Sequence, residues 1–334
     1  MIRRLLYLIY YFKNLDWSLM CKFMNYVTTK NQVNQYYLWL NVLYCSLKYN
    51  ISLLEYFQFG FYDLNKSERK KWAGTGFMYE FQKLMNPTKY REVLDDKLLF
   101  AKKYGALIRH LVFGIDELVS DEKKIETILS NPSGKLVFKE SRGKCGKSVA
   151  IGLVEEFDKA SIISYMRKNG FDLVEEFIVQ HPSMSSLSPS AVNTVRIFTQ
   201  LDENKEVIIL GCRLRISINS IIDNLAAGNA AAAIDENTGR VTGVAVFSDI
   251  TKEDIDIHPV TGIKITGFQI PFWSETVEMA YKAALMHPQN RSIGWDIAIT
   301  ATGPDLIEGN HDWCKLLWQL PVKKGLKEQL IKYI

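Results

Sequence analysis

The spacing of apolar residues changes along this chain of 334 residues, and the change limits the folds open to it. Residues 1–95 are rich in Leu, Tyr, Phe and Lys and poor in Gly, and their apolar positions recur every three to four residues, as in helices. From about residue 131, short runs of β-forming residues alternate with turn signals. Strands mixed with helices in this pattern indicate an α+β protein, and the length allows two or three lobes.

The second part of the chain predicts two blocks of strands. In the first, strands over 136–140 and 148–153 flank a Gly-rich loop, and a helix over 159–168, capped by Gly170, leads to a strand over 172–178. In the second, turn signals separate further strands. We expect these strands at 195–200, 206–216, 231–234, 241–247, 293–300 and 305–308, and a helix at 272–286.

Three oxygen-bearing side chains are predicted to meet on the last hairpin. Glu308 and Asn310 are two residues apart and share one face of a strand, and a turn near Gly303 places Asp296 opposite them. Mg²⁺ prefers carboxylate and amide oxygens and commonly shares them with substrate phosphates. Alone, the pattern also fits a solvated hairpin with scattered polar residues, but the apolar residues that flank all three favour a metal site.

A basic, glycine-containing loop follows the first predicted strand. Lys139 ends the strand, and Gly143, Gly146 and Ser148 follow it. Glycines let backbone N–H groups approach phosphate closely, and lysine supplies positive charge. The spacing does not fit a Walker A loop, and the predicted strand after the loop does not fit a Rossmann fingerprint. Taken alone, the segment fits a phosphate loop and a basic hairpin turn equally well.

Two further segments carry weaker signals. Lys97 lies at the start of a predicted helix, where lysines often serve solubility only. An acidic, apolar strand end could offer backbone groups to an adenine edge, although a half-buried strand edge would look the same. This strand end consists of Glu175, Glu176, Phe177 and Ile178.

The order and spacing of these elements resemble those of the ATP-grasp superfamily over roughly residues 94–315. The order runs from Lys97 and Lys139 through residues 175–178 to Asp296, Glu308 and Asn310. The resemblance implies an ATP-grasp fold, in which two α+β lobes clasp ATP, here with a helical N-terminal region. It divides the chain into residues 1–95 (helical region), 96–180 (small lobe with the Gly-rich loop) and 181–334 (large lobe with the metal site).

The resemblance also implies a role for each motif. The two lysines would hold the ATP phosphates, the glycine loop would fold over them, and the segment from Glu175 to Ile178 would receive the adenine. The late acid and the E-x-N pair would bind Mg²⁺. The residues implied are Lys97, Lys139, Gly143, Gly146, Ser148, Glu175, Glu176, Phe177 and Ile178 for ATP, and Asp296, Glu308 and Asn310 for metal.

Motifs at 180–181, 190–196, 213–215 and 223–229 narrow the resemblance to the sugar-transfer associated ATP-grasp branch, whose members are associated with surface polysaccharide synthesis. Arg196, Arg213 and Arg215 lie on predicted strands, and arginine forks bind carboxylates and phosphates. Surface ion pairing is the alternative reading. With ATP assigned, we favour contact with substrate or the γ-phosphate, in a catalytic group that includes Asn224 on a neighbouring loop.

The family setting predicts an ATP- and Mg²⁺-dependent carboxylate–amine ligase. A carboxylate would attack the γ-phosphate, and an amine would then attack the acyl phosphate. The partners would be a small-molecule or glycan-precursor carboxylate and an amine. A kinase of the same fold, with Asp223 as base for a sugar or polyol hydroxyl, is the alternative. A nucleotide-binding module without catalysis is the third reading.

Charge and cysteine content set the remaining limits. The formal charge of +4 gives no reason to expect nucleic acid. Five scattered cysteines without a CxxC pair argue for a reducing, cytoplasmic setting. Residues 1–50 hold six Lys or Arg against one acid, Asp16, so a basic, aromatic helix could lie on the inner membrane face. Packing of the apolar run Leu5 to Phe12 on the domain is the alternative reading.

Overall fold

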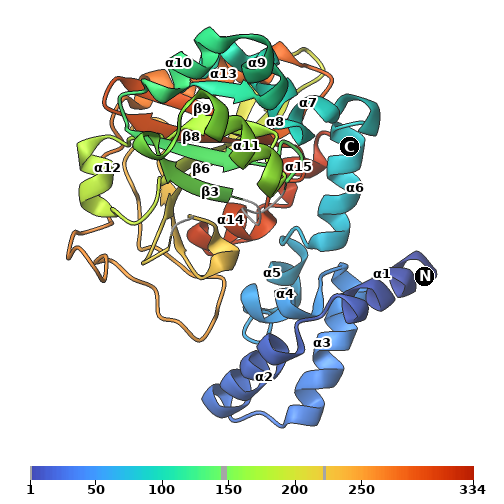
Figure 1. Cartoon of the computed structure of the whole chain (residues 1–334). Coiled ribbons are helices and arrows are strands. Elements are labelled where there is room, and N and C mark those ends of the chain that lie inside the picture. Colours follow the sequence, from blue (N-terminus) through green and yellow to red (C-terminus); the bar gives the residue numbers. More distant parts are fainter. Residues whose placement is uncertain (1, 144–148, 221–222) are drawn as a thin grey trace.

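The computed structural model describes residues 2–143, 149–220 and 223–334 (Figure 1). Helices form the N-terminal region, and two antiparallel sheets with further helices form the remainder of the chain. This arrangement confirms the predicted α+β class. The boundaries at 95/96 and 180/181 stay our proposal.

The N-terminal helices begin at residues suited to cap them. Asp16 accepts a hydrogen bond from the Leu19 N–H (2.9 Å), Asn34 caps the third helix, and Ser52 forms a capping box with Glu55. The inner faces of the first four helices form one apolar core that includes Phe23, whereas the sixth packs through Phe81 on Trp313 and Trp318 in a second core. These helices are α1 (Ile2–Lys13), α2 (Trp17–Asn31), α3 (Gln35–Tyr49), α4 (Leu53–Gln58), α5 (Lys66–Lys70) and α6 (Thr75–Met85).

A buried ion pair fixes this region to the end of the chain. Lys315, in α14 (Lys315–Gln319), lies 2.8 Å from the Glu55 carboxylate, which also accepts from Thr75. After α6, buried Asn86 donates to the carbonyls of Ser292 and His311, at 2.8 Å each. The helical region is therefore attached both to α14 and, through Asn86, to β8 of the large sheet and the residue that follows β9.

The small sheet has the order β1-β4-β2-β3. One apolar core joins it to α9 (Ile115–Ser120), α10 (Glu122–Leu129) and α11 (Lys159–Asn169), through Leu118, Ile125 and Ile162. Gly170 ends α11 in the left-handed region with φ +73°, as predicted. The strands are β1 (Val112–Gly114), which the sequence did not predict, β2 (Lys135–Lys139), β3 (Val149–Leu153) and β4 (Leu173–Glu176).

The large sheet has the order β7-β6-β5-β8-β9, and α13 (Trp273–Met286) packs on one face. Its strands are β5 (Thr194–Leu201), β6 (Val207–Ile216), β7 (Ala230–Ile234), β8 (Ser292–Thr300) and β9 (Gly303–Asn310). The short helices α7 (Glu92–Asp95) and α8 (Lys97–Tyr104) precede the small sheet, α12 (Pro182–Leu187) precedes β5, and α15 (Glu328–Ile331) follows α14.

One predicted strand was wrong. Residues 241–247 do not form a continuous strand, because only isolated bridges join Val241 to Ile234 and Val246 to Ala231. Gly243 and the bridge from Ala245 to Ile255 lie between them. The backbone of residues 241–247 thus forms hydrogen bonds partly with β7 and partly with the loop that follows. A run of apolar residues does not predict this division.

Candidate functional site

A row of charged side chains crosses the large sheet on the face away from α13. Trp295 and Ile297 belong to the core that includes α13, so Asp296 between them points to the other face. Pairing across the strands aligns Arg213, Arg196, Asp296 and Glu308, one from each of β6, β5, β8 and β9. The hairpin thus places Asp296 opposite Glu308, as the sequence predicted.

Asp296 is buried and held by two arginines. Arg196 binds it through Nε and through Nη2, the latter 2.6 Å from Oδ2, and Arg215 Nη1 lies 2.7 Å from the same oxygen. Burial would raise the pKa of Asp296, but the charges of Arg196 and Arg215 hold that pKa well below its usual range. Gly294 makes room for this contact, because a Cβ there would lie 3.1 Å from Arg196 Cδ and 2.8 Å from Trp313 Cβ.

Arg215 joins Asp296 to the loop after β6. Its Nη2 lies 2.6 Å from Asp223 Oδ1, and Asp223 also accepts from the N–H and hydroxyl of Thr194 at 2.8 and 2.6 Å. Burial opposes the charge on Arg215, but the two carboxylates raise its pKa above the usual range. Asn224 follows Asp223, and its carbonyl accepts from Asn229 Nδ2 at 3.1 Å. This loop is thus anchored beside the arginines.

Arg213 points elsewhere. Its guanidinium donates to the carbonyls of Trp318 and Cys212 rather than to a carboxylate. Burial lowers its pKa to about 10. Its predicted contact with substrate stays a prediction.

Glu308 lies beside Asp296 and forms no ion pair with a lysine or arginine among the described residues. Asn310 Nδ2 is 3.1 Å from Glu308 Oε1 and 3.4 Å from the Gly294 carbonyl. Burial and the negative charge of Asp296 raise the pKa of Glu308. Among the described residues, no group of three His, Cys, Asp or Glu side chains is arranged to hold a metal ion. The predicted metal ligands are of a different composition, with two carboxylates and one amide.

The two predicted phosphate lysines lie on the small-lobe side. Lys97, the first residue of α8, donates from Nζ to the carbonyls of Gly143 (2.5 Å), Glu140 and Ser141 (both 3.3 Å). Burial lowers the pKa of Lys97, the charge of Glu308 opposes this, and that of Lys139 adds to it. Lys97 is therefore close enough to both Lys139 and Glu308 to feel their charges.

Lys139 pairs with Glu175 across the small sheet. Burial would raise the pKa of Glu175, but Lys139 and His110 keep it below its usual value. The loop after Lys139 is fixed at its start, where the Ser141 N–H and hydroxyl each donate to Asp172 at 2.6 Å. Of the loop residues predicted to bind phosphate, Gly143 is described, and Gly146 and Ser148 lie outside the described residues.

The predicted adenine segment crosses from one sheet to the other. The Glu176 N–H bonds the Leu111 carbonyl, and the Phe177 ring lies under Lys135 Nζ, 5.2 Å from its centroid. Ile178 is half-buried, and Gln180 then bridges to Thr300 of β8. The segment therefore connects the small sheet to the end of β8 in the large sheet.

The sequence reasoning missed one buried pair close to this crossing. His110 Nδ1 lies 2.9 Å from Asp305 Oδ2, and the Arg109 N–H donates to Asp305 Oδ1 at 2.8 Å. Burial alone would lower the pKa of His110, but Asp305 raises it. In the sequence, the sign of this pair is Asp305, a single acid between Pro304 and Leu306 on a predicted strand.

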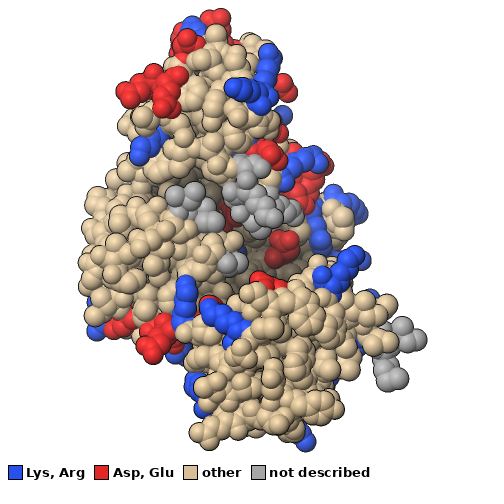
Figure 2. Space-filling model, turned by 60° about the horizontal axis from the view of Figure 1, so that its bottom comes forward, with Lys and Arg blue, Asp and Glu red and all other residues tan. Residues whose placement is uncertain are grey.

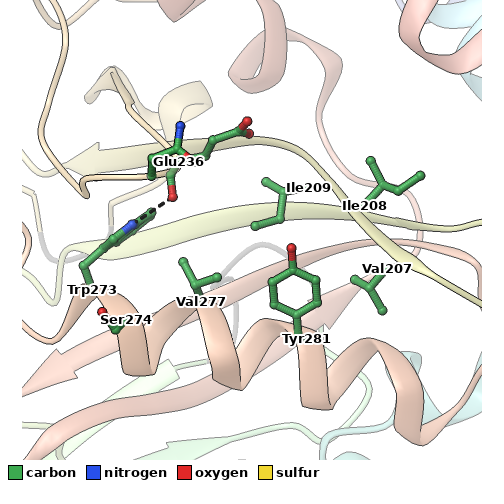
Figure 3. A pocket seen from close by; sticks show the side chains of 9 residues that line it. Val207, Ile208, Ile209, Glu236, Trp273, Ser274, Val277 and Tyr281 are labelled. Atoms are coloured by element: carbon green, nitrogen blue, oxygen red, sulfur yellow. Dashed lines mark hydrogen bonds between the residues drawn. The ribbon is translucent and has the colours of Figure 1, made fainter.

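A separate hollow lies away from this site. It has a volume of about 590 Å³ and opens between β6 and α13, where Val207, Ile209, Val277 and Tyr281 line it (Figure 3). Glu236 is the one charged side chain among its lining residues. The charged row is on the opposite face of the sheet. Figure 2 shows red acidic side chains in a hollow near the centre of the view.

Several solved structures are similar to this chain. They include the ATP-grasp ligase PsnB complexed with minimal precursor (12% identity, TM-score 0.39, 75% of this chain and 63% of that one). Biotin carboxylase from Campylobacter jejuni has 13% identity and a TM-score of 0.45, over 77% of this chain and 51% of that one. D-cycloserine synthetase DcsG has 12% identity and a TM-score of 0.42, over 76% and 78%. The chain thus spans less than two thirds of the first two, and no curated protein matches it.

One family model covers most of the chain. Residues 77–333 match the model described as sugar-transfer associated ATP-grasp, and this range contains both sheets and every residue of the candidate site. The chain belongs to the sugar-transfer associated ATP-grasp family.

Proposed function

We propose that the protein is an ATP-dependent carboxylate–amine ligase that acts through an acyl phosphate. The observation that carries this proposal is that Lys97 lies within electrostatic reach of both Lys139 and Glu308, while Arg196 and Arg215 bind Asp296 opposite Glu308. Lysines near a pair of carboxylates suit a triphosphate with its divalent ion.

The donor set fits Mg²⁺. Glu308 has a raised pKa because it is buried beside the negative Asp296, and a divalent cation would relieve that repulsion. Asn310 can present its amide oxygen to the same place after rotation of the amide group, since its Nδ2 now bonds Glu308. When bound, Mg²⁺ would neutralise phosphate oxygens during transfer.

The arginines suit the carboxylate that attacks. Arg215 shares its guanidinium between Asp296 and Asp223, so its charge lies at the boundary between the metal candidates and the loop that holds Asn224. In the first step a carboxylate oxygen would bond the γ-phosphorus, and ADP would leave. In the second an amine would bond the acyl carbon, and phosphate would leave with loss of the amine proton. Lys97 and Lys139 would hold the β- and γ-phosphates.

The family description supports a sugar-linked substrate class. We propose that the carboxylate or the amine belongs to a glycan precursor, and that the reaction takes place on the cytoplasmic side of the membrane, where ATP is available. The four described cysteines are free, in keeping with a reducing setting.

A kinase would need a base such as Asp223. Both oxygens of this carboxylate already accept hydrogen bonds, from Arg215 and from Thr194. Three of the roughly four acceptor positions of this carboxylate are thus occupied by contacts that hold the loop in place, and we therefore favour the ligase.

The test combines thermal shift with product analysis. Mg-ATP should raise the melting temperature, since a ligand that binds only the folded state stabilises it. The protein is then incubated with Mg-ATP and pairs of uronic acids, amino acids and amino sugars. ADP release that requires both a carboxylate and an amine, with a product that has lost one water, supports the ligase. A stable phosphorylated product without ligation would establish the kinase instead. Binding of Mg-ATP without any turnover would favour a nucleotide-binding module that has no catalytic activity.

A further inference from the structure

The first helix carries apolar side chains on two sides. Tyr7, Leu8 and Tyr11 face the core of the N-terminal region. The side away from that core carries Leu6, 61% exposed, and Ile9, 58% exposed, together with exposed Leu5 and Tyr10. Apolar side chains gathered on the exposed side of a helix indicate a surface that binds a partner, and no described part of the chain covers this side of α1.

The third helix continues this surface. Tyr36, Leu40, Tyr44 and Leu47 recur at helical spacing on one side of α3, and Tyr36 is 73% and Leu40 50% exposed. Arg4 of α1 donates to the carbonyls of Leu47 (2.8 Å) and Lys48, so the two helices are joined at this end. We name these eight residues the α1/α3 face. They are Leu5, Leu6, Ile9, Tyr10, Tyr36, Leu40, Tyr44 and Leu47.

The charges around the α1/α3 face are positive. Helices α1 and α3 contain no acidic residue, and Arg3, Arg4, Lys13 and Lys48 lie on them. One acid from another helix, Glu80, lies 3.5 Å from Arg3 and accepts a hydrogen bond from Tyr7. Figure 2 shows the helical region, in its lower part, as a broad surface with few charged side chains.

We propose that the α1/α3 face binds an anionic lipid bilayer, with α1 and α3 lying in the plane of the interface. Apolar and aromatic side chains enter the boundary between headgroups and acyl chains, and Tyr is well suited to that depth. The lysines and arginines at the edges bind the lipid phosphates. None of the described helices is long and apolar enough to cross a membrane, so the contact is peripheral.

The charge pattern selects this partner over a second copy of the chain. Two copies that met through this face would bring their basic edges together, and like charges oppose such a contact. An anionic surface complements both the basic edge and the apolar centre. The inference does not depend on the proposed ligase chemistry, because it uses no residue of the nucleotide site.

The experiment is flotation of the full chain with vesicles. One set is pure phosphatidylcholine, and the other contains roughly one third phosphatidylglycerol. We expect the protein to float with the anionic set, and the bound fraction to fall as salt is raised. Lys13→Gln with Lys48→Gln should weaken the partition coefficient by about fivefold per charge removed. Ile9→Ser with Leu40→Ser should weaken it about tenfold or more.

Matched controls lie in exposed positions elsewhere. Val119→Ser with Leu285→Ser removes two similarly exposed apolar side chains, and Lys123→Gln with Lys168→Gln removes two charges from the small lobe. Neither pair should change flotation. Unchanged melting temperature and unchanged stabilisation by Mg-ATP verify that the test variants fold. Absence of wild-type flotation with anionic vesicles overturns the proposal. A dimer in sedimentation analysis that Ile9→Ser with Leu40→Ser dissociates, without vesicle binding, would establish self-association instead.

Discussion

Asp296 and Glu308 lie directly opposite each other on β8 and β9, yet of these two carboxylates only Asp296 forms ion pairs with arginine in the described structure. The pKa of Asp296 is therefore lowered and that of Glu308 is raised, although both are carboxylates in one row. Two opposite shifts at neighbouring acids mark Glu308 as the group that gains most from an added cation.

Glu308→Gln separates metal binding from folding. Without metal, the raised folded pKa of Glu308 gives stability at low pH that is lost as pH rises through that pKa. The melting temperature of Glu308→Gln relative to wild type should therefore rise with pH. With Mg-ATP the order reverses, because the variant has lost a carboxylate ligand and should gain less from the nucleotide. Both are measured by thermal unfolding across a pH series.

Glu203→Gln is the matched control, since Glu203 is exposed in the turn between β5 and β6. It should follow wild type in both series. If Glu308→Gln keeps the full Mg²⁺-dependent stabilisation by ATP, Glu308 is not a metal ligand.

The sequence predicted the parts of the site that depend on local geometry. The turn between Thr300 and Gly303 fixes the pairing of β8 with β9 as far as Ile297 and Leu306, so the sequence predicted that Asp296 and Glu308 lie close together. A bulge between Asp296 and Ile297 then shifts the register by one residue and sets Asp296 directly opposite Glu308, which the turn alone does not predict. Lys97 at the start of α8 followed from helix signals just as close in sequence.

The partners of these residues were not predictable in the same way. Arg196 is 100 residues from Asp296, and the two meet because β5 pairs with β8, a choice that no local pattern encodes. The same holds for His110 and Asp305, 195 residues apart. The sequence thus identified the acids and arginines but not which arginines neutralise which acid, and it missed the histidine.

Lys97→Met should weaken nucleotide binding. Lys97 donates to three carbonyls at the start of the glycine loop, so its loss removes a proposed phosphate contact and a tie that holds the loop. We expect the Kd for Mg-ATP to rise by about tenfold or more, as for loss of a hydrogen bond to a charged group. Isothermal titration measures it. Lys102→Met, on the exposed side of the same helix, should bind like wild type, and equal affinities of the two variants would refute the role of Lys97.

Arg215→Met should destabilise the fold as well as abolish turnover. Arg215 is shared by Asp296 and Asp223, and its side chain is 12% exposed, so its loss leaves two poorly solvated carboxylates without it. Removing one partner of such a buried arrangement costs about 3–5 kcal/mol. Urea unfolding measures this, and Arg240→Met, at an exposed position, should change stability by less than about 0.5 kcal/mol. A small effect of Arg215→Met would mean that water or Arg196 compensates fully.

His110→Gln should change how stability depends on pH. The pKa of His110 is raised above its ordinary value because Asp305, at 2.9 Å, outweighs the effect of burial. A raised folded pKa gives stability that is fully present below the unfolded value of about 6.5 and is lost as pH rises through the folded value. The free energy of unfolding of wild type should therefore exceed that of His110→Gln most at low pH, by about 1.5–3 kcal/mol for a charged hydrogen bond, and the difference should shrink toward alkaline pH.

His287 should show the opposite dependence on pH, because burial and then Lys103 lower its pKa. The stability of His287→Gln relative to wild type should therefore rise as pH falls. Urea unfolding of the three proteins across the same pH series distinguishes the two slopes. A His110→Gln difference that does not vary with pH would show that His110 stays neutral beside Asp305.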